Sequence, residues 1–277
     1  MDSLVLYHSA FSPSALKVRF VLEERGLAWE GRLLDLMAKQ NLQPEYLAIN
    51  PRGLVPTLVV GGRAVIESAV ICEFLEDYVD AEVGAPSLRP SDPFACARMR
   101  VWMKVADEDL HWATGPIPFA TLGRLQWLGL SEAQREELLA ATPDRARAAA
   151  QRSLFERGLE APEIDVALAT WARTLSELEA ALTEHEWLAG AAISLADFSV
   201  AAHVYMLDYM QLNWAFEAHP RLRRWYERVK QRPAFARSLD PYLPAPVLDF
   251  IAAQAAAVGP GLSERLAAAS LAAQPRG

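Results

Sequence analysis

The chain has 277 residues, of which 52% are hydrophobic and 22% charged, and its formal net charge is −8. That length suffices for one large domain or two ordinary ones. No uninterrupted apolar run reaches the roughly 18–20 residues of a spanning helix, and no basic leader precedes the first apolar run. The acidic balance disfavours nucleic acid and anionic membranes as partners. We therefore expect a soluble cytoplasmic protein with no nucleic-acid or membrane partner.

Metal, disulfide and nucleotide chemistry find no support in the sequence. The two cysteines, Cys72 and Cys96, lie in apolar, helix-like runs, which predicts two buried thiols. The five histidines have no metal-ligand spacing, and HExxH, CxxC and Gly-rich phosphate motifs are missing. We expect no metal site.

The first 80 residues alternate strand and helix patterns. An apolar run at 4–7 leads through a small-residue turn at 9–14 into a helix from Ala15, for which Gly26 is the C-terminal stop. Two β-rich runs joined by Gly61 and Gly62 predict a tight hairpin. The expected strands are 4–7, 28–34, 57–60 and 63–66, with helices at 15–25, 43–47 and 69–79, the last with Val70, Ile71, Phe74, Leu75 and Tyr78 inward. The order is β-α-β, a connection, then β-β-α.

The rest of the chain reads as helix. A Gly- and Pro-rich break at 81–93 predicts a linker. The helices expected beyond it are 94–119 (bent or ended at 115–118), 131 to past 155, 162–182, 195–212, 220–229 and 233–239, followed by an Ala-rich segment, 248–273. We predict an α/β domain at 1–80, a linker at 81–93, an all-helical domain at 94–246 and an extension at 247–277.

Three short stretches carry candidate chemistry. The turn at 9–14 is rich in serine and opens a helix, whose first N–H groups and dipole suit an anion. Val55-Pro56 precedes the hairpin; it is either an ordinary loop proline or a cis bond that leaves the Val55 backbone free for a peptide-like ligand. Ser68 is placed to cap the helix that follows it, where it could bind a carboxylate, while Glu67 takes an ammonium group.

The ordered trio resembles the cytosolic glutathione transferases. Ser12, the motif Asn50-Pro-x-Gly-x-Val-Pro56 and the pair Glu67 and Ser68 stand in the order found in that family, ahead of an all-helical region. The resemblance implies a thioredoxin-like N-terminal domain that binds glutathione and an all-α helical-bundle C-terminal domain. It also implies that the capping pair Ser194 and Asp197 is the family's folding motif.

The resemblance also suggests site residues. Ser12-Pro-Ser-Ala-Leu-Lys-Val-Arg19 is similar to the serine-type classes (theta, zeta, phi and tau), which places the thiol-activating hydroxyl at Ser12, with Ser14 in reserve. A hydroxyl donor and the helix dipole favour the thiolate, which is the nucleophile. The residues expected to bind glutathione are Lys39, Asn41, Val55, Pro56, Glu67 and Ser68, and those expected to line an apolar electrophile pocket between the domains are Phe11, His111, Trp112, Phe119 and Trp214.

The substrate is less narrowly indicated. Segments 68–78, 88–94 and 99–104 look like the bacterial glutathione-dependent lignin β-etherases, which implies thiolate attack on a carbon bearing an aryloxy group. We expect a transferase acting on an aromatic, aryl-ether or halogenated carbon of a small hydrophobic electrophile. The alternatives are β-aryl ether cleavage specifically, maleylacetoacetate-type isomerisation, and a non-catalytic interaction module. The family further implies a cytoplasmic homodimer with a role in detoxification.

Overall fold

The computed structural model describes residues 2–79 and 86–273, so part of the predicted 81–93 linker lies outside the described residues. Contacts divide the chain into two compact units. Unit 1 comprises Met1–Asp107, Ala181–Val204 and Arg223–Pro244, and unit 2 comprises Glu108–Ala180, Tyr205–Leu222 and Ala245–Gly277.

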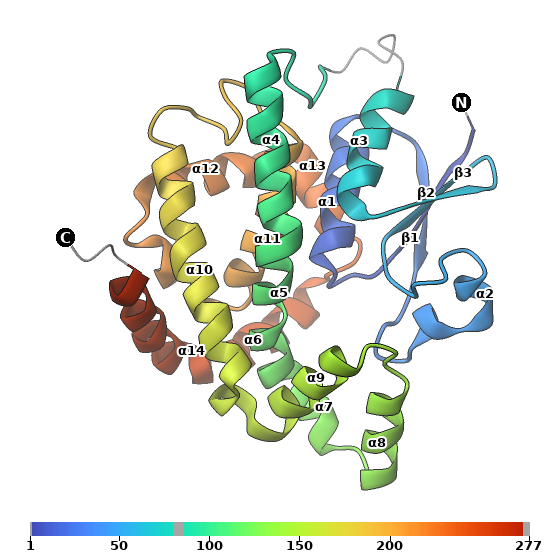
Figure 1. Cartoon of the computed structure of the whole chain (residues 1–277), viewed down its shortest axis with the longest axis vertical. Coiled ribbons are helices and arrows are strands. Elements are labelled where there is room, and N and C mark those ends of the chain that lie inside the picture. The colour runs from blue at the N-terminus through green and yellow to red at the C-terminus, as the bar shows by residue number, and fades with distance from the viewer. Residues whose placement is uncertain (1, 80–85, 274–277) are drawn as a thin grey trace. The chain divides into compact units, whose positions relative to one another are not determined.

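Unit 1 begins with a four-stranded sheet and its helices (Figure 1). The elements are β1 (Leu4–His8), α1 (Pro13–Glu24), β2 (Trp29–Leu33), a 3₁₀ turn (Gln40–Leu42), α2 (Pro44–Leu47), β3 (Thr57–Val60), β4 (Arg63–Ile66) and α3 (Ser68–Tyr78). The strand order is β2-β1-β3-β4. β1 runs parallel to β2, whereas β3 is antiparallel to both β1 and β4. The predicted order of strands and helices is confirmed.

The strand register gathers the loops that matter at one end of the sheet. Tyr7 of β1 pairs with Thr57 of β3, and Thr57 pairs with Ile66 of β4. On the other side of β1, His8 pairs with Leu33 of β2. The chain after β1, after β2 and after β4, and the chain before β3, therefore all leave the sheet at the same end.

Local sequence explains these elements. The hairpin turn uses Gly61 and Gly62 at φ of 53° and 78°, a conformation that L side chains rarely adopt. α1 is buried from Ser14 to Leu22 and packs against α3 and α13 (Pro233–Leu239), so it is a central helix of unit 1. Gly26 follows α1 at φ +64°, as expected of a stop.

The predicted inward face of α3 is partly wrong. Ile71 and Leu75 are buried, but Val70 is 55% exposed. Glu76 is buried in its place, because its carboxylate forms an ion pair with Arg25 at 3.2 Å and accepts a hydrogen bond from the Leu88 N–H at 2.9 Å. An ion-paired carboxylate thus occupies a position that hydrophobicity alone assigns to the surface.

The remaining helices are mostly as expected. They are α4 (Pro93–Val105), α5 (His111–Thr114), α6 (Pro116–Pro118), α7 (Arg124–Leu128), α8 (Glu132–Ala140), α9 (Arg145–Arg157), α10 (Pro162–Ala181), α11 (Leu195–Tyr209), α12 (Pro220–Lys230), α13 and α14 (Ala245–Ala273), with π-helical turns at Ala106–Leu110 and Phe119–Gly123. The predicted core stripe of α10 is confirmed, since Ile164, Leu168, Trp171, Leu175 and Leu178 are all buried.

One expectation about this region is confirmed and two are wrong. The helix expected over 94–119 is interrupted at Gly115, where α5 ends and α6 begins, so the predicted bend or end at 115–118 is confirmed. The helix expected from 131 to past 155 is two helices, because Asp144 caps a new one by accepting the N–H groups of Ala146 and Arg147. Cys72 is buried as predicted, but Cys96 is only half-buried, and both thiols are free.

α14 is the C-terminal element of unit 2. Among the helices of residues 2–79 and 86–273, it is the one long and apolar enough to cross a membrane by length and composition, a test that helices of soluble proteins also pass.

Candidate active site

Ser12 is the N-cap of α1, at the end of the sheet where the loops gather. Its φ of −80° and ψ of 114° are those of a cap, and its Oγ accepts the N–H of Ala15 at 3.2 Å. Pro13 follows at the first helical position, where a missing N–H costs nothing. Because the Ala15 contact uses Oγ as an acceptor, the hydroxyl proton remains available to an anion in front of the helix. Ser14, the reserve residue, lies in the first turn of α1 and is buried.

The Asn50–Pro56 motif is a turn held together by buried amide and hydroxyl groups. The Asn50 side-chain N–H groups donate to Leu54 O and Thr57 Oγ1, both at 2.9 Å, and its Oδ1 accepts from the Arg52 N–H. The Tyr46 hydroxyl contacts Thr57 Oγ1 at 2.8 Å. This bonding fixes the chain immediately before β3.

The Val55-Pro56 bond is cis, which selects between the two alternatives that the sequence left open. Within the described part of the chain, the backbone N–H and C=O of Val55 have no hydrogen-bond partner. These two groups can therefore pair with an extended, peptide-like molecule beside the sheet.

The predicted capping role of Ser68 is wrong. The cap of α3 is Glu67, which has φ +68° and forms no side-chain capping bond, and Ser68 is the first residue of the helix. A non-glycine residue at this φ is strained by about 1–3 kcal/mol. α3 begins directly after β4, so its first turn and the buried Ser68 lie at the same end of the sheet as Ser12. The first N–H groups of that turn have no hydrogen-bond partner among residues 2–79 and 86–273, and such groups suit a carboxylate.

Glu67 already has a partner, since its carboxylate forms an ion pair with Arg52. Both side chains are more than half exposed, so the pair contributes little stability. An incoming ammonium group can compete with Arg52 for this carboxylate.

Lys39 and Asn41 lie in the loop that follows β2. Lys39 adopts φ +57°, and Asn41 donates from Nδ2 to Gly53 O at 2.6 Å, which ties this loop to the turn before Val55. The Oδ1 atom of Asn41 is buried and has no hydrogen-bond partner among the described residues. Gly53 is required there: its φ is +61°, and a Cβ would lie 2.7 Å from Leu42 Cδ2.

The residues predicted for the electrophile pocket belong to different units. Phe11 lies in unit 1 and is 48% exposed. The other four lie in unit 2, where His111 and the exposed Trp112 contact each other edge to face at 5.5 Å. Phe119 packs against a buried cluster of Trp127, Leu139 and Phe155. Trp214 is half-buried, and its Nε1 has no partner within the described chain.

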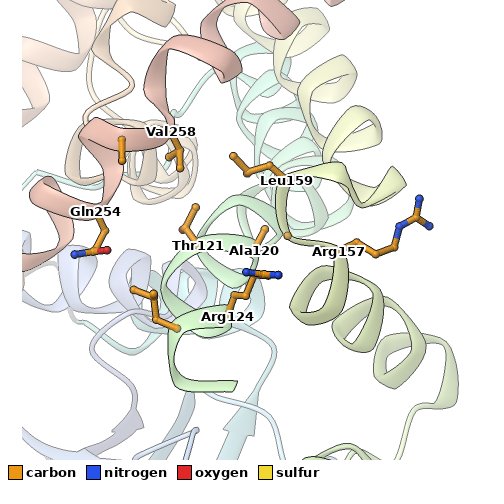
Figure 2. A pocket seen from close by; sticks show the side chains of 10 residues that line it. Ala120, Thr121, Arg124, Arg157, Leu159, Gln254 and Val258 are labelled. Atoms are coloured by element: carbon orange, nitrogen blue, oxygen red, sulfur yellow. The ribbon is translucent and has the colours of Figure 1, made fainter. Parts of the chain in front are cut away.

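Unit 2 contains a cavity of about 410 Å³ that the sequence did not specify. Its lining residues come from the second π-helical turn and α7, from the end of α9 and the 3₁₀ turn after it (Gly158–Glu160), and from α14: Ala120, Thr121, Arg124, Leu125, Arg157, Gly158, Leu159, Gln254, Ala257 and Val258. Figure 2 shows the apolar side chains of Leu159 and Val258 facing the hollow, while the Arg157 guanidinium extends away from it. The cavity lies beside the residues that follow Pro116 and Pro118.

At one end of the small mixed sheet lie a serine that caps a helix, a cis-proline turn and a second helix N-terminus. These features define a glutathione-binding domain of the transferase type. Two family models agree, the glutathione S-transferase N-terminal domain over residues 11–78 and the C-terminal domain over residues 144–228.

The relatives support the same family. Protein LigF of Sphingobium sp. (strain NBRC 103272 / SYK-6) is 32% identical over 246 residues, covering 86% of this chain and 93% of LigF. The crystal structure of beta-etherase LigF aligns with a TM-score of 0.76 at 30% identity, over 86% of this chain and 99% of that one. Glutathione S-transferase 3 of Zea mays is 29% identical over 240 residues, which cover 86% of this chain and 94% of the maize protein. The chain belongs to the glutathione S-transferase family and is a glutathione transferase.

Proposed function

We propose that this transferase cleaves aryl ethers with a glutathione thiolate that Ser12 stabilises. The thiolate sulfur attacks the carbon that bears the aryloxy group, so that a C–S bond forms as the C–O bond breaks. The electron pair of the C–O bond leaves on the aryloxide, which takes a proton from solvent. The products are a glutathione thioether and a phenol.

One observation supports glutathione binding: the loops that carry Ser12 and Val55 and the first turn of α3 at Ser68 all lie at the same end of the sheet. A tripeptide needs a backbone partner, a carboxylate site and a group that stabilises its thiolate. The unpaired Val55 backbone supplies the first, the N-terminal turn of α3 the second and Ser12 the third.

The assignment extends to the two ends of the tripeptide. The ammonium group of the γ-glutamyl end meets Glu67, displacing Arg52. Lys39 and Asn41 bind the carboxylate of the glycyl end, since the loop after β2 leaves the sheet at the same end as Ser12. These two contacts are electrostatic, and we expect them to weaken with ionic strength.

Ser12 acts on the thiol through its hydroxyl. A free thiol with a pKa near 8.5 is mostly protonated at neutral pH. A hydrogen bond to a charged group is worth about 1.5–3 kcal/mol, and the N-terminus of α1 adds a smaller dipole contribution. Together they lower the thiol pKa toward neutrality, where the thiolate becomes the main species.

The electrophile class follows from LigF, whose structure carries the name beta-etherase. The apolar cavity of unit 2 supports an uncharged aromatic substrate, because its volume lies in the range of small-molecule sites. We further propose that the protein is a cytoplasmic homodimer whose role includes detoxification, as the resemblance to its family implied.

An interaction module is the second candidate, because FtsZ-localized protein A of Caulobacter vibrioides is 28% identical over 236 residues, covering 83% of this chain and 88% of that protein. That protein is named for its localisation and not for a reaction. A non-catalytic interaction module does not require a group that activates the thiol of glutathione. Measuring turnover of an electrophile with glutathione therefore distinguishes the transferase from the module.

The test is product analysis on the full chain. A β-aryl ether with a nitrophenoxy leaving group is incubated with glutathione, and nitrophenolate release is followed by absorbance while the thioether is identified by mass. We expect stoichiometric phenol and thioether, with kcat/KM reduced by about 10- to 100-fold in Ser12→Ala, as expected for losing one hydrogen bond to a charged group. Conjugation of chloro-dinitrobenzene without ether cleavage would refute the ether class. No turnover and no retention on immobilised glutathione would favour the module.

A further inference from the structure

The buried side chain of Arg19 makes a set of contacts that the proposed function does not use. Arg19 lies in α1, seven residues after Ser12, and is fully buried. Its Nε donates to Ser238 O at 2.8 Å, and its Nη1 contacts His8 Nδ1 at 3.2 Å. The guanidinium also stacks on the ring of Tyr242, 4.7 Å from its centroid.

The remaining contacts go to the turn that carries Ser12. Nη1 donates to Ser9 O at 3.1 Å, and Nη2 donates to Ala10 O at 3.3 Å. The same Ser9 oxygen accepts the backbone N–H of Ser12 at 3.3 Å. One carbonyl therefore joins the guanidinium to the backbone of the catalytic serine.

We propose that Arg19 is a positioning residue for thiol activation: it fixes the turn so that Ser12 and the adjoining N–H groups face the thiolate of glutathione. This inference rests on the proposed role of Ser12. Arg19 acts through the backbone and touches neither substrate.

The first reason is geometric. The position of Ser12 Oγ depends on the cap backbone, which is tied to Ser9 O, and Ser9 O is held by the planar fork of a guanidinium. A hydroxyl that moves by about 1 Å loses most of its hydrogen bond to the sulfur, because such bonds weaken steeply with distance and angle.

The second reason is electrostatic. In a trans peptide the N–H points opposite to the C=O, so directing Ser9 O toward Arg19 directs the Ala10 N–H away from it. The Ala10 N–H has no hydrogen-bond partner among the described residues and is available to an anion. Directing the two carbonyl oxygens inward also removes the negative ends of their dipoles from the thiolate.

The residues around Arg19 hold its guanidinium in place. Burial and the Arg19 charge lower the pKa of His8 to about 3, so the ring is neutral at physiological pH and its Nδ1 can accept from Arg19. Tyr242 stacks on Arg19 and lies edge to face with His8 at 4.8 Å. A buried guanidinium needs such a complete set of partners to offset its desolvation.

Lys17 offers a matched control on the same helix. It is also fully buried, but its ammonium group forms an ion pair with Asp107 and no hydrogen bond to the turn is found within the described chain. Replacing Lys17 removes a buried cation from α1 without releasing Ser9 O or Ala10 O.

The test measures the pKa of enzyme-bound glutathione from the thiolate absorbance between pH 5 and 10, in wild type, Arg19→Lys, Arg19→Gln, Lys17→Met and Ser12→Ala. Lysine keeps the charge but cannot reach all four acceptors. We expect Arg19→Lys to raise the bound thiol pKa by about one unit and to lower kcat at pH 6.5 about tenfold, while KM for glutathione stays within about twofold because the Val55 and Ser68 contacts persist. Lys17→Met should lower the melting temperature without moving the thiol pKa.

The outcomes separate this inference from the proposed function. If Ser12→Ala raises the thiol pKa and Arg19→Lys does not, Arg19 is merely structural and the inference is wrong. If neither variant moves it, Ser12 does not activate the thiol, and both claims fall. Because Arg19→Gln risks misfolding, Arg19→Lys decides, with its circular dichroism compared with that of wild type.

Discussion

Asp197, in the first turn of α11, is the strongest single test of how unit 1 is held together. Its carboxylate is fully buried and accepts four hydrogen bonds. Oδ1 accepts from the Leu188 N–H at 2.9 Å and from Trp225 Nε1 at 2.8 Å. Oδ2 accepts from the N–H and Oγ of Ser194 at 2.8 and 2.9 Å. One side chain thus joins α11 to α12 and to the loop before α11.

The expected cost of Asp197→Ala follows from these contacts. The Ser194 hydroxyl can rotate to another acceptor, but the N–H groups of Leu188, Ser194 and Trp225 cannot. At about 1–3 kcal/mol for each buried donor without a partner, the variant loses roughly 3–6 kcal/mol after relaxation. A domain is stable by only about 5–15 kcal/mol, so the variant loses a large share of its stability. Asp197→Asn keeps one acceptor oxygen, and we expect about half that loss.

Urea unfolding followed by tryptophan fluorescence measures the effect, with Asp92→Ala as the control. Asp92 caps α4 through one bond, 2.7 Å to the Ala95 N–H, in an exposed position. Losing such a cap costs about 1 kcal/mol. An Asp197→Ala variant that is no less stable than Asp92→Ala would refute the reasoning about the buried donors.

Three further predictions concern His8, Cys72 and Gly123. Burial and Arg19 lower the pKa of His8 from 6.5 to about 3 in the folded state, so the unfolded chain binds this proton first as the pH falls. The free energy of unfolding is therefore unaffected by His8 above pH 6.5 and falls by about 1.4 kcal/mol per pH unit toward pH 3. His8→Gln should remove this loss from acid-unfolding curves. Burial raises the pKa of the Cys72 thiol to about 12, whereas Cys96 is half-buried. Ellman's reagent should therefore titrate one thiol, that of Cys96, in the native protein and both thiols in denaturant. Two thiols that react fast in the native protein would contradict the burial of Cys72. A Cβ on Gly123 would lie 2.9 Å from Phe155 Cε1, so Gly123→Ala should cost about 1–3 kcal/mol in urea unfolding, whereas Gly259→Ala meets nothing within 4 Å and should be neutral or stabilising.

Much of the fold could be predicted from local sequence because the signals are strong and short-range. Gly61 and Gly62 can supply the positive φ of the hairpin turn, and the apolar stripe of α10 has a clear helical period. The break between α8 and α9 was not predicted, although the sequence contains a signal for it. Pro143 disfavours helical conformation at the residue before it, and Asp144 is a good helix cap.

Other features depend on tertiary structure. The burial of Glu76 requires Arg25, which lies far away in the chain. Ser68 was expected to cap α3, but Glu67 takes the strained conformation that starts the helix. Whether Val55-Pro56 is cis depends on the surrounding turn, so the sequence left both isomers open.

The residues of the candidate site were predicted from a sequence motif. The local sequence around each of them predicts only a turn or a helix start. The structure brings the elements of Ser12, Val55 and Ser68 to one end of the sheet. The role of Arg19 could not be read from the sequence, because Ser238 and Tyr242 approach it from more than 200 residues away.

The central claim is that Ser12 stabilises the glutathione thiolate, and the pKa of bound glutathione tests it most directly. Ser131→Ala is the matched control, because Ser131 is also an N-cap, that of α8, and accepts the N–H of Gln134 at 3.4 Å. Both variants should lose about 1 kcal/mol of stability. The account predicts a bound thiol pKa about 1–2 units higher in Ser12→Ala than in wild type and unchanged in Ser131→Ala. An equal thiol pKa in wild type and Ser12→Ala would contradict it.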